Sequence, residues 1–574
     1  MFRCLWTLMV FHGVCVQSLL PLVIPEGIND KSCVKICSSN IYCQGELLDD
    51  IQSCRLFGDS KTFVDMKLKK NETDILEAYA VLKSQTGTPV PRNKMLDFIA
   101  SNFEECKLLE WIPSDFKENP LIVDTVQDSS YKSFVKSVNQ LWKTLAKKVS
   151  DDVYKNPELY SAIYLPNGFF IAGDRFNEIY YWDSYWIIKG ALICGMQDTV
   201  KGIIENFIYM VQKYGCVLNG GRIYYSGRSQ PPFLLQMVDA YYKFTHDSNF
   251  VLDNLECLEQ EVKFWLTKRC ITVEKDGQYY TLARYNTRTC GPRPESYYED
   301  KNLAQPLNTL LDKNDLYARI KSAAESGMDF STKHFNNNGS NTGTLINTDP
   351  QNFFYVELNS ILQSNCEILS KFFFMKGDQL KADKYNLYGT RFQRGIDNLL
   401  WNEEEGIWLD YDITTKKSRN YFYGTNFVPL FTGSYLKDKS DYYGDRAIQY
   451  LIKNKIINDN LKLNCVFCVP TSLYESSQQW DYPNCWPPLQ SMLIFGLDST
   501  TSEKAKMCAF NLADAWIKTN YAGFQKTGYM FEKYSAISFG TSGDGGEYKP
   551  QKGFGWTNGV VFEIFNRWGN ELKC

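Results

Sequence analysis

Apolar residues recur at intervals of three and four along most of the chain from about residue 130 onward. This spacing puts side chains on one face of an α-helix, so it predicts amphipathic helices that bury one side. The clearest windows are residues 200–214, 358–373 and 508–516. The first window stops at Gly215, and glycine commonly ends helices because it tolerates a positive φ.

Patterns typical of β-strands are short and local. Residues 221–225 and 277–282 predict pieces of β-hairpin. No glycine-rich phosphate-binding turn follows a strand, which argues against a doubly wound sheet. Helices of ordinary length joined by long loops predict an all-α fold in which helix pairs stack into a toroid or bundle.

The charge balance excludes one class of partner. The chain has 574 residues, with 62 Lys and Arg against 66 Asp and Glu, and its net charge is -4. Neither the total nor any local run of basic residues supports nucleic-acid binding. The chain is long enough for two ordinary domains or for one large helical barrel.

The first residues predict export. A short basic start and an apolar run lead to small polar residues, so we expect residues 1–18 to be a signal peptide and the mature protein to be secreted. A membrane anchor is the competing interpretation, but the apolar run is shorter than a bilayer requires. No later segment has about twenty uninterrupted apolar residues, so no membrane anchor is evident.

The chain has 18 cysteines, a number that suits an oxidising compartment in which disulfides form. Four of them crowd residues 19–58, and we expect them to staple this N-terminal segment by one of three pairings: Cys33, Cys37, Cys43 and Cys54. Residues 59–574 then form the barrel domain. Asn71 and Asn338 begin glycosylation sequons, which fit secretion.

A metal site is not expected. The spacing of Cys465 and Cys468 is compatible with a redox or metal-binding pair. However, only His246 and His334 remain after the predicted signal peptide to complete such a site. The same shortage of histidine argues against a Ser-His-Asp or Cys-His mechanism.

Residues 173–186 combine an arginine, carboxylates and aromatic rings in fourteen positions. Burying Arg175, Glu178 and Asp183 unpaired would be costly, whereas planar polar groups beside rings suit a sugar, which has flat C–H faces and a rim of hydroxyls. The alternative is an aromatic-rich helix start with surface ion pairs.

Carboxylates supply the remaining acid–base chemistry. Hydrolysis of a glycosidic bond needs one protonated carboxyl to donate to the leaving oxygen and one ionised carboxylate. The candidates in loops are Asp183, Glu295, Asp329, Asp481, Glu532 and Glu547. Sequence spacing does not rank them, and each has the alternative role of a helix cap, an ion-pair partner or a substrate hydrogen-bonder.

Arginines and tryptophans recur in the same loops. Arg175, Arg228 and Arg293 each lie near Gly or Pro, where a guanidinium can bind hydroxyls or brace the loop through a salt bridge. Four tryptophans lie beside polar loop residues, where a ring face can pack on a pyranose: Trp182, Trp480, Trp486 and Trp556.

These motifs together resemble the trehalases, inverting hydrolases that cleave α,α-trehalose into two glucoses. Residues 173–186 and 479–488 resemble the two family signatures, and five further loops match in order: residues 227–232, 293–297, 325–330, 531–534 and 545–558. The resemblance covers residues 60–568 and implies an (α/α)6 barrel that needs no cofactor.

The resemblance also implies roles for individual residues. Asp329 corresponds to the general acid and Glu532 to the general base that activates water. The residues placed around the two glucose rings of the substrate, trehalose, are Arg175, Trp182, Asp183, Asn219, Arg228, Ser229, Gln230, Arg293, Glu295, Gly327 and Glu547. Asp329 must hold a proton near the working pH, which burial or a neighbouring carboxylate promotes and an arginine opposes.

Several family positions are altered in this chain. Trehalases usually have Trp where Met328 precedes the acid, and Arg and Trp where Lys333 and His334 follow it. The other altered positions are Ala172, Asp174, Cys485 and Ser535. Two alternatives to a trehalase therefore stay open: a weakened relative that binds trehalose, and a hydrolase of another small glucoside such as maltose. Asp174 is also expected to compete for the neighbouring Arg175.

Overall fold

The computed structural model describes residues 33–173, 175–551 and 553–574. The predicted signal peptide at residues 1–18 and the predicted competition of Asp174 for Arg175 lie outside these residues. Within them, none of the helices is both long and apolar enough to cross a membrane.

The described residues contain a closed ring of helices in which each packs on the next and the last packs on the first. This inner ring consists of α9 (Asp183–Ile193), α11 (Leu234–Thr245), α16 (Val356–Lys376), α18 (Val428–Thr432), α20 (Pro487–Asp498) and α22 (Gly555–Trp568). Helices α9, α20 and α22 are buried along nearly their whole length, as expected for helices surrounded by protein on all sides.

A second set of helices packs around this ring and alternates with it along the chain. The outer set consists of α7 (Ser129–Leu145), α10 (Gln197–Tyr214), α13 (Leu255–Lys268), α17 (Gln379–Gly395), α19 (Ser440–Lys453) and α21 (Glu503–Thr527). This alternation of outer and inner helices is an (α/α)6 barrel, so the predicted fold class is confirmed.

The helical periodicity located these elements well. Helix α10 ends where the apolar pattern stops, and Gly215 follows in the left-handed conformation with φ 83°. Helices α16 and α21 contain the other two predicted faces, and they also end before glycines with positive φ, Gly377 and Gly528. The glycines stop these helices because they adopt this backbone conformation without strain.

Strands are short and lie between the helices along the chain. The predicted hairpin at residues 277–282 is confirmed, since β6 (Cys270–Lys275) pairs antiparallel with β7 (Gln278–Ala283). The remaining strands form two- and three-stranded patches: β1 (Lys67–Leu68) with β2 (Phe103–Glu104); β3 (Leu109–Glu110), β4 (Ala146–Lys148) and β5 (Phe169–Phe170); β8 (Phe353–Phe354), β11 (Tyr411–Asp412) and β12 (Lys417–Ser418); β9 (Trp401–Asn402) with β10 (Ile407–Trp408); β13 (Asn484–Cys485) with β14 (Tyr534–Ser535).

The strand predicted at residues 221–225 is wrong. This segment ends in a 3-10 turn, η2 (Ile223–Tyr225). A strand would send neighbouring side chains to opposite faces. Here the hydroxyls of Tyr224 and Tyr225 join one buried polar cluster: Tyr224 donates to Asp65 at 2.7 Å and Tyr225 to Glu178 at 3.2 Å.

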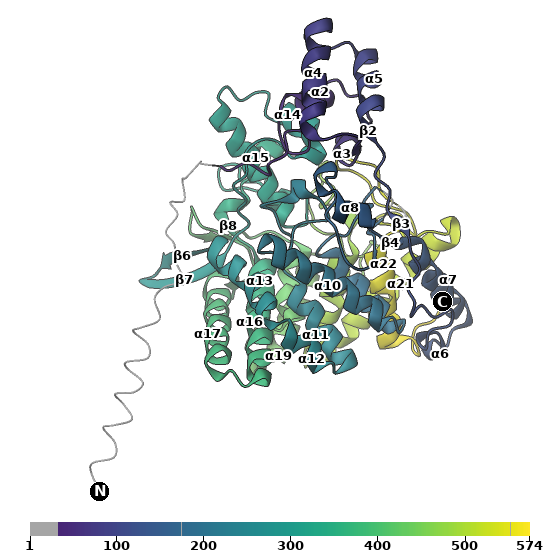
Figure 1. Cartoon of the computed structure of the whole chain (residues 1–574). Coiled ribbons are helices and arrows are strands. Elements are labelled where there is room, and N and C mark those ends of the chain that lie inside the picture. Colours follow the sequence, from purple (N-terminus) through teal and green to yellow (C-terminus); the bar gives the residue numbers. More distant parts are fainter. Residues whose placement is uncertain (1–32, 174, 552) are drawn as a thin grey trace.

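Smaller helices cover one end of the barrel. They are α2 (Glu46–Ser53), α3 (Ser60–Val64), α4 (Glu72–Thr86) and α5 (Arg92–Asn102) from the N-terminal part, and α14 (Tyr297–Leu303) and α15 (Leu310–Glu325) from the long loop before α16. Figure 1 shows both groups together at the top of the molecule. Three further short helices are α6 (Ile122–Thr125), α8 (Asp151–Lys155) and α12 (Ser248–Asp253).

Disulfides correct the predicted pairing of the N-terminal cysteines. Cys37 pairs with Cys43, but Cys33 pairs with Cys290, 257 residues away, and Cys54 is free. The reason is tertiary: Val34 donates to the Arg288 carbonyl at 2.8 Å, which lays the N-terminal segment against the loop before α14. The cysteines of this segment therefore bind it to the barrel as well as to itself.

Cys465 and Cys468 do not form the redox or metal-binding pair with which their spacing is compatible. Cys468 forms a disulfide with Cys485, which lies in β13, while Cys465 is free and exposed. Among the described residues, no group of three or more His, Cys, Asp or Glu side chains is arranged to hold a metal ion.

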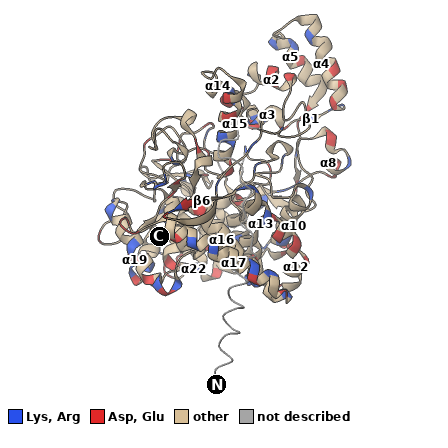
Figure 2. Ribbon diagram, turned by 90° about the vertical axis from the view of Figure 1, so that its left-hand side faces the viewer, with Lys and Arg blue, Asp and Glu red and all other residues tan. Residues whose placement is uncertain are grey.

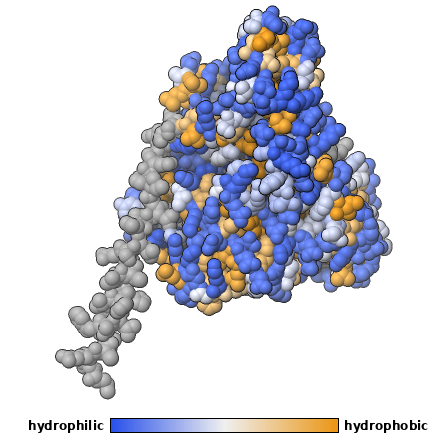
Figure 3. Space-filling view, in the orientation of Figure 1, coloured by the Kyte–Doolittle hydropathy of each residue, from blue (hydrophilic) through white to orange (hydrophobic). Residues whose placement is uncertain are grey.

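The surface mixes charges of both signs. Figure 2 shows basic and acidic residues interspersed over the helices, in agreement with the small net charge of -4. On the face seen in Figure 3, hydrophilic residues dominate and hydrophobic ones gather only in small groups.

Candidate active site

The predicted site residues meet at one end of the barrel. They lie in the loops that lead from an outer helix to the next inner helix, or at the start of that inner helix. One pocket is lined by Arg175, Trp182, Asp183, Asn219, Arg228, Gln230, Arg293, Glu295, Gly327, Asp329, Glu532 and Glu547. The barrel thus brings together residues that are up to several hundred positions apart in the chain.

Among the residues that the resemblance places around the substrate, Ser229 does not line this pocket. Its hydroxyl donates to the Val217 carbonyl at 2.6 Å, and its backbone N–H donates to Glu325 at 3.0 Å. Both contacts lie inside the protein, so they fix the loop between its neighbours Arg228 and Gln230, which do line the pocket.

Asp329 follows α15, and its side chain is half-buried at the pocket. Burial raises the pKa of this carboxyl to about 6, Arg293 opposes the rise, and the negative charge of Glu547 adds to it. Burial therefore outweighs the arginine, which the sequence left open. A carboxyl with this pKa keeps its proton in mildly acidic solution.

Glu532 lies in the loop before α22 and is buried, with 1% of its surface exposed. One carboxylate oxygen accepts a hydrogen bond from the Tyr548 hydroxyl at 2.8 Å, and the other accepts one from the backbone N–H of Gln551 at 3.2 Å. Burial raises the pKa of Glu532, whereas Lys533 and these two donors lower it. The donors stabilise the ionised form of the side chain.

Asp183 begins α9 and is a third carboxyl of the pocket. Burial, with smaller contributions from the negative charges of Glu532 and Asp329, raises its pKa to about 8. Asp183 is therefore protonated at neutral pH, and a protonated carboxyl donates a hydrogen bond as well as accepting one.

Arg293 is held in a fixed orientation by two carboxylates. Its Nη2 donates to Asp300 at 2.7 Å and to Glu547 at 2.9 Å, and Ser296 donates to the same glutamate at 3.3 Å. The guanidinium is fully buried and still lines the pocket beside Asp329. Arg293 therefore braces its loop through salt bridges and also lines the pocket.

Arg228 and Glu295 form a second buried pair across the pocket wall. Within the described residues, Nε and Nη1 of Arg228 and Oε2 of Glu295 have no hydrogen-bond partner. Burying unpaired polar atoms costs free energy. These atoms are available to bind the hydroxyls of a ligand in the pocket.

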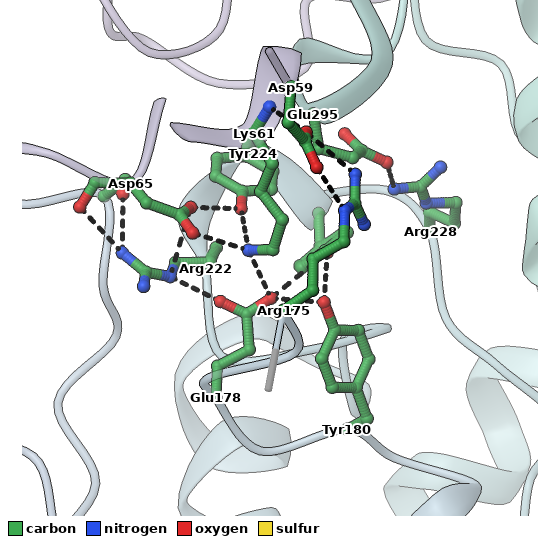
Figure 4. Close-up of polar contacts among 12 residues, drawn as sticks. Asp59, Lys61, Asp65, Arg175, Glu178, Tyr180, Arg222, Tyr224, Arg228 and Glu295 are labelled. Carbon is green, nitrogen blue, oxygen red and sulfur yellow. Dashed lines mark hydrogen bonds and ion pairs between the residues drawn. The ribbon is translucent and has the colours of Figure 1, made fainter. Parts of the chain in front are cut away.

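Arg175 is held by a residue that the sequence did not indicate. Its Nη2 donates to Asp59 at 2.9 Å, its Nε donates to the same carboxylate, and its own backbone N–H donates to Gln551 at 2.9 Å. Figure 4 shows the guanidinium of Arg175 pointing at Asp59, the residue before α3. The N-terminal part of the chain therefore contributes to one wall of the pocket.

Glu178 joins the same N-terminal part to the barrel. It accepts from Lys61 at 2.9 Å and from Arg222 at 2.5 Å, and the Tyr180 hydroxyl donates to it at 2.6 Å (Figure 4). Burial would raise its pKa, but Lys61 and Arg222 outweigh it and hold the pKa at about 2. Glu178 is thus a structural carboxylate outside the pocket.

Tryptophans form the apolar side of the pocket. The rings of Trp480 and Trp486 stack with centroids 3.8 Å apart, and Trp182 lies 5.7 Å from Trp480. Gly327 has φ 74°, and a Cβ there would stand 2.6 Å from the Trp182 ring. Glycine is therefore required at position 327 both by the backbone and by the packing of Trp182.

Comparison with known proteins identifies the family of this chain. The family model described as Trehalase matches residues 55–569. The chain belongs to the trehalase family. A trehalase of Pimpla hypochondriaca is 42% identical over 536 residues, covering 93% of this chain and 91% of that one, and a trehalase of Homo sapiens is 39% identical over 538 residues, covering 93% and 90%.

Among solved structures, the neutral trehalase Nth1 from Saccharomyces cerevisiae matches with a TM-score of 0.54 and 24% identity, covering 70% of this chain and 73% of that chain. At this identity the likeness concerns the fold. It agrees with the (α/α)6 barrel built from the helix packing.

Three of the positions that depart from the trehalase pattern, Met328, Lys333 and His334, lie close to Asp329 in the chain. Met328 is buried and does not line the pocket. Nε2 of His334 lies 3.1 Å from the Met328 carbonyl, and Nδ1 lies 2.8 Å from the Tyr355 hydroxyl. A carbonyl can only accept, so we assign the proton to Nε2. Burial, with Lys333 nearby, lowers the pKa of His334 to about 3, so the ring is neutral.

Lys333 is also buried behind the pocket of this trehalase-family chain. Its ammonium contacts Asp410 at 2.5 Å, Glu357 at 3.2 Å and Thr425 at 2.9 Å. Another altered position, Cys485, forms the disulfide with Cys468. Each of these residues has partners of its own in this chain.

Asp481, a carboxylate candidate from the sequence, is a structural residue. It accepts hydrogen bonds from the hydroxyls of Ser331, Ser472 and Ser476 and from the backbone N–H of Thr332, at 2.7–2.9 Å. It does not line the pocket. Its contacts join the loop after Asp329 to the loop of the second trehalase signature.

Sequence reasoning gave no site role to several residues around the pocket, among them Tyr548, Gln479, Lys533 and Asp59. Tyr548 follows a predicted site residue, and its aromatic type beside Glu547 was the available signal. Gln479 and Lys533 lie within recognised trehalase motifs. Their contacts join two loops, and the sequence of either loop alone does not reveal such a contact. Asp59 lies outside the matched motifs and gave no signal.

Proposed function

We propose that this protein hydrolyses α,α-trehalose to two glucose molecules with inversion at the anomeric carbon, using Asp329 as general acid and Glu532 as general base. The observation that carries the proposal is that Asp329 and Glu532 reach one pocket from loops 203 positions apart, with different hydrogen-bond and charge surroundings. Family membership supports the choice of substrate.

The proposed reaction is a single displacement. Glu532, as the carboxylate, accepts a proton from a water molecule, and the oxygen of that water forms a bond to the anomeric carbon. The glycosidic C–O bond breaks, and Asp329 gives its proton to the departing glucose oxygen. The pKa of about 6 at Asp329 leaves it protonated in mildly acidic solution.

The remaining pocket residues suit a small, hydroxyl-rich ligand. The unpaired atoms of Arg228 and Glu295 match hydroxyl acceptors and donors. Protonated Asp183 offers a donor, and Arg175, Asn219, Gln230 and Glu547 line the same space. Trp182 presents a ring to the apolar face of a sugar. Arginines on several sides support a disaccharide over a long chain.

Export is the second part of the proposal. Three disulfides support an oxidising compartment for the mature protein. Asn71 and Asn338 are exposed, as glycosylation sites must be. Expression in a secreting eukaryotic cell should place the protein in the medium and give a glycan-dependent mass that falls in Asn71→Gln and Asn338→Gln variants. Retention inside the cell with no glycan would contradict this part.

The test of activity is an NMR time course on purified protein. With trehalose, α-glucose and β-glucose should appear in equal amounts at first, because inversion converts one of the two α-linked rings into β-glucose. Release from maltose and not from trehalose would favour the alternative glucoside. Calorimetric binding of trehalose without hydrolysis would favour the weakened binding relative.

Two substitutions test the roles. Asp329→Asn and Glu532→Gln should each lower kcat by roughly 10²–10⁴-fold, the range for general acid–base catalysis, and should leave the fold intact by circular dichroism. A folded Asp329→Asn variant that hydrolyses trehalose at the wild-type rate would overturn the assignment of the acid.

A further inference from the structure

The backbone of the acid loop is held by the second signature loop. The Asp329 carbonyl accepts a hydrogen bond from Nε2 of Gln479 at 2.7 Å, and the next carbonyl, that of Phe330, accepts one from the backbone N–H of Trp480 at 3.0 Å. Two consecutive peptide groups at the proposed acid are therefore fixed by two consecutive residues of another loop.

The other end of the same amide reaches the base loop. Oε1 of Gln479 accepts a hydrogen bond from the ammonium of Lys533 at 2.8 Å, and Lys533 also donates to the Gly545 carbonyl at 3.2 Å. Lys533 is the residue after Glu532. Gln479 is 2% exposed and Lys533 is 0% exposed, so water does not compete for these contacts.

The chemistry of the partners fixes the orientation of the amide. The Asp329 carbonyl can only accept a hydrogen bond and the Lys533 ammonium can only donate one. Gln479 must therefore turn its N–H toward Asp329 and its oxygen toward Lys533. An ionised carboxylate at position 479 would lack the donor, and a lysine or arginine would lack the acceptor.

We propose that Gln479 and Lys533 are positioning residues that connect the acid loop to the base loop and so fix the placement of Asp329 relative to Glu532. We call these two residues the Gln479–Lys533 bridge. The inference rests on the catalytic roles proposed above for Asp329 and Glu532, and neither bridge residue is proposed to transfer a proton.

The second signature loop and the base loop are also joined by contacts other than the bridge. Strand β13 pairs with β14, so the second signature loop and the base loop are held together by a short ladder, with Cys485 opposite Tyr534. The ladder does not include Asp329. Trp480 and Asp481 hold the residues that follow Asp329, whereas Gln479 contacts Asp329 itself and Lys533 as well.

Lys533 also acts on the base through its charge. Burial raises the pKa of Glu532, and Lys533 is the strongest of the groups that lower it, followed by Tyr548, the Gln551 N–H and Arg175. Burial lowers the pKa of Lys533 itself, and the carboxylates of Glu532, Asp544 and Asp329 oppose that change. Removing the ammonium should therefore make Glu532 easier to protonate.

The experiment compares kcat and KM for trehalose in Gln479→Met, Gln479→Glu and Lys533→Met variants of the full chain. Methionine keeps the length of either side chain and removes its polar contacts. Glutamate keeps the contact with Lys533 and removes the donor to Asp329. We expect kcat to fall roughly 10²-fold in each glutamine variant, the size reported for small displacements of catalytic groups, with KM changed less than about threefold.

A double variant tests whether the two residues act together. If they form one bridge, Gln479→Met with Lys533→Met should lose little more kcat than the worse single variant, whereas independent effects should multiply. The Lys533→Met variant should also show the acidic limb of its kcat/KM profile at higher pH, because its Glu532 protonates more readily.

Matched controls separate the bridge from general damage. Gln478 lies next to Gln479 and its amide donates to Ser477 at the surface, and Lys526 is exposed. Gln478→Met and Lys526→Met should keep the wild-type kcat. Circular dichroism and thermal unfolding check that each variant folds. If Gln479→Met does not fold, Gln479→Glu provides the test.

Three results would overturn the inference: a folded Gln479 variant with kcat within about twofold of the wild type, effects that multiply in the double variant, or an unmoved acidic limb in Lys533→Met. Failure of the proposed function looks different. It would appear in the wild-type protein, or in active Asp329→Asn and Glu532→Gln variants, before any bridge variant is measured.

Discussion

Asp329 and Glu532 belong to the same pocket, but the protein contacts them at different atoms. Both carboxylate oxygens of Glu532 accept hydrogen bonds, from Tyr548 and from the backbone of Gln551. At Asp329 the protein binds the backbone instead, through the amide of Gln479. The contacts of Glu532, the proposed base, thus favour its ionised form, while Asp329, the proposed acid, is held by its main chain.

This difference supports the opposite roles proposed for the two carboxyls. Donors aimed at a carboxylate lower its pKa, and burial without such donors raises it. At Glu532 the donors and Lys533 oppose burial, which still raises the pKa, and at Asp329 burial prevails over Arg293 and raises the pKa to about 6.

The largest expected effect is a difference between the Asp329 and Glu532 variants on a substrate whose leaving group needs no proton. α-Glucosyl fluoride releases fluoride, which needs no proton from Asp329. We therefore expect Asp329→Asn to hydrolyse this substrate at a rate near that of the wild type, although it loses roughly 10²–10⁴-fold on trehalose. Glu532→Gln should lose activity on both substrates, because water still needs its base.

Fluoride release, measured with an ion-selective electrode, checks this expectation. The comparison uses both variants and the wild type at one pH. If Asp329→Asn were equally impaired on both substrates, Asp329 would not be the acid. If Glu532→Gln recovered activity on the fluoride, the two roles would be exchanged.

The next effect concerns the donor that distinguishes the base. Tyr548→Phe removes the hydroxyl that donates to Glu532 at 2.8 Å and keeps the ring. A hydrogen bond to a charged group contributes about 1.5–3 kcal/mol, so kcat/KM should fall roughly 10–100-fold, and its acidic limb should move to higher pH.

The pH profile of kcat/KM measures this change, with Tyr279→Phe as the control because Tyr279 is exposed on β7. The basic limb, which we assign to Asp329, should stay in place. An acidic limb at the wild-type position would show that Tyr548 does not act through Glu532.

Local sequence was sufficient for the helices and for most residues of the pocket. The periodicity around Val200 and the stop at Gly215 depend only on neighbouring residues, so they located α10 correctly. The family motifs carry their side-chain types in each loop, and the structure brings nearly all the residues named from them to one pocket.

Contacts between distant loops were not predictable in this way. The pairing of Arg175 with Asp59 and of Cys33 with Cys290 joins segments that meet only in the folded protein. The short segment at residues 221–225 looked like a strand because its tyrosines favour strands, yet their hydroxyls are drawn to Asp65 and Glu178. Tertiary contacts decided each of these cases.

A smaller effect concerns stability and the third carboxyl of the pocket, Asp183. Its folded-state pKa of about 8 lies above the value near 4 of an unfolded chain, so the folded protein binds this proton more tightly. The resulting stabilisation is complete below about pH 4 and is lost as the pH rises to about 8. Each pH unit in this window costs at most about 1.4 kcal/mol.

Asp183→Asn should remove this part of the pH dependence. Its melting temperature should fall less than that of the wild type between pH 5 and pH 8, while Asp438→Asn, at an exposed position, should follow the wild type. The slope should not vanish, because burial also raises the pKa of Glu261 to about 7. Parallel melting curves for Asp183→Asn and the wild type would contradict the raised pKa.

The smallest effect tests the acid through its neighbour Glu547. The negative charge of Glu547 raises the pKa of Asp329, although less than burial does. Glu547→Gln keeps the shape and removes the charge, so the basic limb of the kcat profile should move below pH 6 by less than about one unit. Measuring kcat at saturating trehalose separates this shift from weaker binding, since Glu547 also lines the pocket.

Glu503→Gln, on the exposed start of α21, is the control for charge alone. A basic limb that moved to higher pH would mean that Glu547 acts mainly by holding Arg293 at 2.9 Å, and that its loss frees the arginine from Asp329.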